Sequence, residues 1–203
     1  MRTITIFFLL FGFTFYGFGQ DEDQNKKGLR YRIFLPSLEI GYVDYSSNEL
    51  SGGIMVKTAI EYRLKTQDSF YFRLNYDNRQ AKYKIAPTGL TNVIEGKVSF
   101  SDLIGGAGYR FGKDKLQWIV LLQGGVSFYS VPEFELNGGV LNLRNAGKNV
   151  PISRLTIGLE YYLDSNSAIT LELLQSQFWN QEDFWKDNQS AWGISLGVTA
   201  TLY

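Results

Sequence analysis

The residues most able to do chemistry together are ten charged side chains at alternate positions of segments with a two-residue hydrophobic period. They are Glu39, Lys57, Glu61, Arg63, Arg73, Glu95, Lys97, Arg110, Glu160 and Glu172. Successive side chains of a strand point to opposite faces, so we expect these charges to share polar faces behind apolar ones. Charges enclosed on such a face are tolerated when they pair. The sequence therefore predicts an interior charge network; the alternative is that some of these residues line a narrow ion or proton path.

The absence of histidine and cysteine from the chain restricts its chemistry further. Acyl transfer by a serine beside a histidine, cysteine nucleophiles and the usual zinc sites all need one of these residues. We therefore predict no catalytic residues, no metal site, no cofactor and no enzymatic activity. Lys plus Arg equals Asp plus Glu at 20 each, which gives no electrostatic basis for binding nucleic acid.

The elements that must position the charges are strands, and the clearest pair lies between Gly53 and Asp77. Apolar and polar residues alternate from Ile54 to Leu64, break at Lys65–Ser69 and alternate again from Phe70. This pattern predicts a hairpin. Similar segments predict eight strands, at Ile33–Tyr45, Ile54–Leu64, Phe70–Asp77, Val93–Phe111, Leu116–Ser130, Leu155–Leu163, Ile169–Leu173 and Trp192–Leu202. Near Asp102 the apolar phase shifts, which predicts a β-bulge.

The connections between these strands alternate in length. The long ones are Ser46–Gly52, Asn78–Asn92, Val131–Ile152 and Asn180–Ser190. Short turns at one end and long loops at the other are typical of outer-membrane barrels. Aromatic residues near strand ends fit interfacial girdles, with Tyr62, Phe70, Phe111, Trp118 and Tyr161 at one end and Tyr42, Tyr76, Phe128, Trp179 and Trp192 at the other. We predict an all-β fold, an eight-stranded antiparallel up-and-down transmembrane β-barrel, over a lipocalin-like soluble barrel with the apolar face inward.

The first residues predict export. Met1 to Gly19 has a positive start, an apolar stretch and small residues before Gln20, which favours a cleavable signal peptide over an uncleaved anchor. We expect residues 20–32 to be a polar lead-in and residues 33–203 to form the barrel domain. We expect the protein in the outer membrane of a Gram-negative bacterium, in contact with its lipid.

Aromatic residues in the predicted loops are candidates for binding a partner. Phe184 and Trp185 lie between acidic residues, and Tyr83 lies among lysines and Arg79. Exposed aromatic residues often dominate protein contacts, although they also serve as rim residues near lipid headgroups. We predict a protein partner bound through long extracellular loops.

Three segments give the chain a family resemblance. They are Gly105-Gly106-Ala107-Gly108-Tyr109-Arg110-Phe111, Ile157-Gly158-Leu159-Glu160-Tyr161-Tyr162 and the terminal strand ending at Tyr203. With Gln20 directly after the leader, the mature chain resembles the small outer-membrane barrels of the Bacteroidetes type, including PorT-like proteins. The resemblance implies a non-enzymatic structural, interaction or accessory component, with a link to protein export. The alternative is a narrow channel or facilitator for a small or hydrophobic solute, of the OmpW type.

Overall fold

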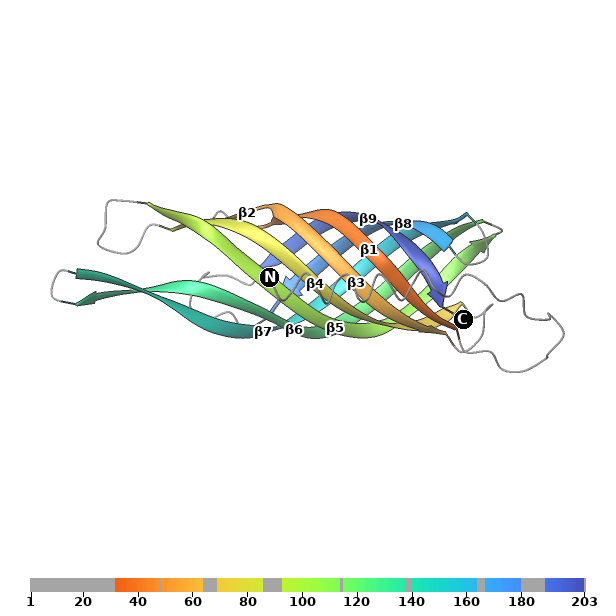
Figure 1. Ribbon diagram of the computed structural model, residues 1–203, viewed down its shortest axis with the longest axis horizontal. Helices are drawn as coiled ribbons and strands as arrows, with labels where there is room; N and C mark the ends of the chain where they lie inside the picture. The colour runs from red at the N-terminus through yellow and green to blue at the C-terminus, as the bar shows by residue number, and fades with distance from the viewer. Residues whose placement is uncertain are drawn as a thin grey trace.

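The computed structural model describes residues 32–47, 49–63, 69–85, 93–113, 115–137, 140–163, 167–179 and 189–202 (Figure 1). Their strands are β1 (Arg32–Tyr45), β2 (Leu50–Ser51), β3 (Gly53–Arg63), β4 (Phe70–Ile85), β5 (Ile94–Lys113), β6 (Leu116–Asn137), β7 (Val140–Tyr162), β8 (Ser167–Phe178) and β9 (Ser190–Leu202). The described part of the chain holds no helix of the length and apolar character needed to cross a membrane. The predicted signal peptide and lead-in up to residue 31 fall outside the described residues.

Eight long strands close into a barrel. Each pairs antiparallel with its neighbours in the order β4-β3-β1-β9-β8-β7-β6-β5, and the pairing of β4 with β5 closes the ring (Figure 1). Closure leaves no unpaired sheet edge in the wall, which lipid requires because it cannot hydrogen-bond to a backbone. The predicted eight-stranded antiparallel barrel is therefore confirmed.

Two irregularities interrupt the ladders. The short strand β2 continues β3 along β4, with Leu50 opposite Tyr83 and Met55 opposite Arg79, so five steps on one side face four on the other. In β1 the register shifts next to Pro36, which has no N–H to donate to a neighbouring strand. The bulge predicted near Asp102 is wrong. The pairs of β5 with β4 and β6 run through Asp102 without a shift.

Two hairpins extend well past the point where the other strands end. Strands β6 and β7 stay paired from Leu116–Tyr161 to Asn137–Val140, and β4 and β5 stay paired to Ile85–Ile94. Figure 1 shows both hairpins projecting from the same end of the barrel. The predicted loops Val131–Ile152 and Asn78–Asn92 are therefore largely strand. Their Asn, Gly and Pro content suggested loops, but continuous pairing with a partner strand overrides such local preferences.

The outer wall is apolar across its middle. Its outward side chains include Leu74, Ile157 and Leu196, the last of which is 59% exposed. The ten aromatic residues predicted to form girdles all point outward as well. An outward apolar band between aromatic girdles is the surface of a barrel embedded in lipid.

Glycines on β5 make room for tyrosine rings on β4. Gly108 lies opposite Tyr71 and Gly96 lies opposite Tyr83. A Cβ added to either glycine would meet the facing ring at 2.4 Å or less. The glycines therefore let each ring lie close against the neighbouring strand, inside the barrel.

Candidate functional site: the barrel interior

The interior near the short-turn end contains seven charged side chains that we call the lower network. They are Glu39, Lys57, Glu61, Arg73, Arg110, Glu160 and Glu172, all buried. Lys57 Nζ donates to Glu39 Oε2 at 2.7 Å and also to Glu172 and Ser195. Six strands of the wall contribute to this network, so it ties distant parts of the chain together.

Two arginines complete the lower network. Arg73 donates to Glu61 at 2.9 Å and to Glu172 at 2.5 Å. Arg110 donates to Glu160 at 2.7 Å and to Glu61 at 3.0 Å. The Arg110 guanidinium also lies over the ring of Tyr71, 4.6 Å from its centroid. Charges removed from water need such multiple partners to offset the loss of hydration.

A second group, which the sequence analysis did not include, lies nearer the projecting hairpins. This upper network consists of Asp77, Arg79, Asp102 and Arg154 and is buried throughout. Arg154 bridges the two aspartates, donating to Asp77 and, at 2.9 Å, to Asp102. Arg79 Nη2 lies 2.8 Å from Asp102. One signal was available, because Asp77 shares its alternation phase with Arg73.

Beyond the upper network the interior becomes apolar. A core of buried side chains from all around the ring includes Val43, Met55, Phe100, Tyr129 and Phe178. The guanidinium of Arg79 reaches the edge of this core, 4.9 Å from the Phe178 ring centroid and 5.3 Å from that of Phe100. The described interior is therefore occupied by charged pairs at one end and by aromatic packing at the other.

Four of the predicted site residues are not found in the interior or contact surface predicted for them. Three lie elsewhere in the structure, and the side chain of the fourth is not described. Glu95 and Lys97 were predicted inside but are exposed on the outer face of β5, and Glu95 pairs there with Lys84. Tyr83 was predicted as an extracellular contact but is only 8% exposed and belongs to the apolar core. The side chain of Arg63 is outside the described part of the structure.

The other two predicted contact residues, Phe184 and Trp185, also lie outside the described residues.

The wrong prediction that Glu95 and Lys97 face the interior has one cause. Alternation along β5 is continuous, so Val98, Phe100 and Asp102 all point inward. The apolar face changes side because the surroundings change from lipid to water above the girdle. No bulge is needed to produce that change.

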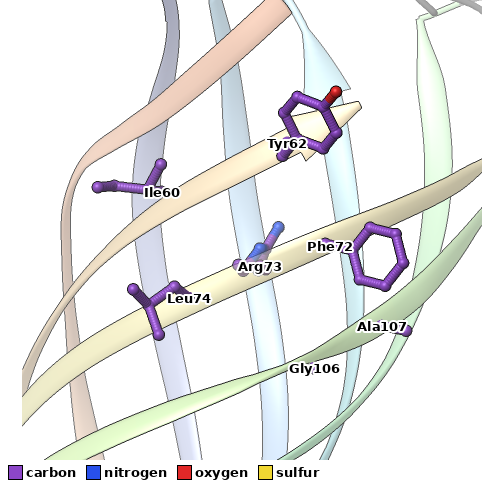
Figure 2. A pocket seen from close by; sticks show the side chains of 7 residues that line it. All are labelled: Ile60, Tyr62, Phe72, Arg73, Leu74, Gly106 and Ala107. Atoms are coloured by element: carbon purple, nitrogen blue, oxygen red, sulfur yellow. The ribbon is translucent and has the colours of Figure 1, made fainter. Parts of the chain in front are cut away.

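A hollow of about 480 Å³ lies on the outer wall, lined by Ile60, Tyr62, Phe72, Arg73, Leu74, Gly106 and Ala107. Figure 2 shows Tyr62 on β3 and Phe72 and Leu74 on β4 at this hollow, beside Gly106 and Ala107. The Arg73 guanidinium belongs to the lower network inside the barrel. The hollow is thus a dent in the lipid-facing surface, made where small residues of β5 adjoin large ones of β4.

The fold is similar to those of several solved structures. Neisserial surface protein A matches with a TM-score of 0.59 and 14% identity, over 85% of this chain and 97% of that one. Ail of Yersinia pestis matches with a TM-score of 0.45 and 11% identity, over 84% and 99%. The N-terminal barrel domain of Pseudomonas aeruginosa OprF has a TM-score of 0.41 and 16% identity, over 84% and 97%. No protein-family model matches the chain, and no curated protein matches its sequence.

The fold and surface define the class of protein. A closed eight-stranded antiparallel barrel with an apolar outer band and a charged interior is an outer-membrane β-barrel. Eight strands leave an interior just wide enough for side chains to fill. The protein resides in the outer membrane, in contact with its lipid.

Proposed function

We propose that this protein is a non-enzymatic, non-conducting outer-membrane barrel that presents its two projecting hairpins to a protein partner. The observation that carries the proposal is the filled interior. The lower network, the upper network and the apolar core follow one another along the axis with side chains exposed by only a few per cent. A barrel whose interior is occupied in this way acts through its surface.

The projecting hairpins support an interaction role. β6 and β7 continue beyond the end of β8 at Phe178, and their pairing is unbroken to the tip. A paired ribbon holds its shape better than a loop, so it can meet a partner at a low cost in ordering entropy. Closure of the barrel wall does not require this extension of β6 and β7 beyond the other strands.

The family resemblance and the amino-acid composition also support this proposal. The resemblance to small Bacteroidetes-type barrels, including PorT-like proteins, favours an accessory role with a link to protein export. The lack of histidine and cysteine supports the absence of catalysis, because it removes the commonest general base and the strongest nucleophile. One alternative function remains to be tested, a narrow channel of the OmpW type.

Conductance separates these two functions. Purified protein inserted into planar bilayers should give no single-channel steps above the background of the empty membrane, with a known porin as the positive control. Discrete, reproducible current steps at physiological salt would favour the narrow channel. They would contradict the proposal that the filled interior does not conduct ions.

A shortened hairpin tests the interaction role. Glu133 lies opposite Arg144, so replacing residues 134–143 with Asn-Gly joins them through a two-residue turn without changing the register below. This variant should assemble normally, as judged by heat-modifiable gel mobility, but lose partners that co-purify with the wild-type protein. A matched control, Gly138→Asn, keeps the hairpin length and should retain them. Equal recovery by the shortened variant would rule out the β6–β7 hairpin as the contact.

A further inference from the structure

Two rungs of the β4–β5 ladder place like charges directly opposite each other. Asp77 lies opposite Asp102, and Lys82 lies opposite Lys97. Like charges facing one another across a strand pair are unfavourable unless a counter-charge lies between them. The two rungs belong to the same pair of strands, so the counter-charges around them can be compared directly.

The aspartate rung is neutralised from within the barrel. Arg154 contacts both carboxylates, and Arg79 adds a second ion pair to Asp102 at 2.8 Å. All four side chains are buried. An arginine that bridges the two opposed aspartates, with a second arginine on one of them, therefore neutralises this like-charged rung.

The lysine rung has no such bridge among the described residues. Lys82 and Lys97 are both exposed on the outer face of the hairpin, and no described carboxylate lies within ion-pair distance of either. The nearest acid along the ladder is Glu95, two rungs further on and on the same outer face. It is engaged with Lys84, its own cross-strand partner, at 2.7 Å. The described part of the chain therefore supplies no counter-charge to the lysine rung.

The height of the rung above the membrane indicates where a counter-charge could come from. Lys82 lies six residues beyond Tyr76, which belongs to the aromatic girdle nearer the projecting hairpins. At about 3.3 Å per residue and a strand tilt of about 40°, this places the rung roughly 15 Å above the girdle. The headgroup layer on one side of a phospholipid bilayer is only about 5–8 Å thick. The lysines therefore stand above phospholipid phosphates, at the level of sugars carried by outer-leaflet glycolipid.

We propose that Lys82 and Lys97 form a binding site for an anionic group, a phosphate or carboxylate, on the sugars of outer-leaflet lipopolysaccharide. The anionic group takes the place that Arg154 takes at the aspartate rung, with the signs of all the charges reversed. Binding would fix the β4–β5 projection against the sugar layer. Lys84 serves as an internal reference, since it has the same charge and similar exposure but already has a partner.

Titration of purified lipopolysaccharide into the detergent-solubilised full-length protein at low ionic strength tests this site. Replacing both lysines (Lys82→Gln with Lys97→Gln) should weaken binding by about 30-fold, the effect expected for two cations at a charged lipid surface. Lys84→Gln should weaken it by no more than about threefold. Lys97→Glu should also abolish the site, because it supplies the counter-charge to Lys82 from within the chain. Gel mobility before and after heating shows that each variant is folded.

Three results would overturn the proposal. One is a double variant that binds lipopolysaccharide as tightly as the wild type. Another is Lys97→Glu retaining wild-type affinity while remaining folded. The third uses vesicles of phosphatidylglycerol without lipopolysaccharide: equal, lysine-dependent binding to them would assign the site to phospholipid headgroups instead. None of these results depends on whether the β6–β7 hairpin binds a protein.

Discussion

The two halves of the barrel are built from the same strands but place opposite residue types on their outer faces. In the membrane-spanning half, lipid surrounds apolar residues such as Leu74 while charges such as Arg73 pair inside. In the projecting half, water surrounds Lys82 and Lys97 while Val98 and Phe100 pack inside. Between the halves, β5 keeps one uninterrupted alternation. The comparison shows that a face of a strand has no fixed polarity. The medium outside the wall decides which residue types each face can carry.

The largest expected effect comes from breaking an ion pair in the membrane-spanning half. Arg73→Met leaves Glu61 and Glu172 with fewer counter-charges, and we expect it to cost about 3–5 kcal/mol of unfolding free energy. Adding Glu61→Met should cost less than the sum of the two single changes, since the pair is then removed together. Urea unfolding in lipid vesicles, followed by tryptophan fluorescence, measures both. Strict additivity would mean that the two side chains do not interact.

Charging the outer wall should separate the halves directly. Leu74→Arg places a cation in lipid near the middle of the apolar band, at an expected cost of about 2–4 kcal/mol. Gln80→Arg makes the corresponding change on the same face of β4, above the girdle, where the side chain meets water. We expect its effect on unfolding in the same vesicles to be close to zero. Equal costs at the two positions would show that the membrane boundary does not lie between them.

A polar substitution inside the projecting half tests the apolar core. Val98 is buried there, so Val98→Asn introduces an amide without a partner, at an expected cost of about 1–3 kcal/mol. Ser99→Asn, one residue along and facing outward, is the control and should be neutral. Hydrogen exchange of the β4 and β5 amides should show the loss as local opening of the projecting half. Unchanged exchange in the Val98 variant would argue that this interior is already hydrated.

The smallest effect is expected at the exposed pair Lys84–Glu95, which sharpens the contrast with the buried networks. Both side chains are largely exposed, 67% and 60%, and water screens their attraction. Lys84→Gln should therefore change the unfolding free energy by no more than about 1 kcal/mol, and added salt should remove the difference. A larger loss that persists at high salt would show that this rung is a structural clamp rather than a solvated pair.

The sequence by itself determined the parts of the fold whose two faces differ in the simplest way. Strict alternation around Val56 and Leu74 placed the strands. The charged phase placed Glu61 and Arg73 on the polar faces of adjacent strands, and the structure finds them paired. The ten girdle aromatics were also assigned to the outer wall from spacing alone. These results depend on period-two geometry, which is local and needs no knowledge of the neighbouring strands.

Tertiary structure decided what alternation leaves open. Alternation says that Glu95 and Lys97 share a face, but the position of the strand relative to the membrane sets whether that face is inside. Continuous pairing with β4 and β6, rather than any local signal, turned the predicted bulge near Asp102 into a straight strand. The same pairing brought Arg154 to Asp77 and Asp102 from a distant part of the chain. Contacts of that kind depend on barrel closure, and a closed ring is a property of all eight strands together.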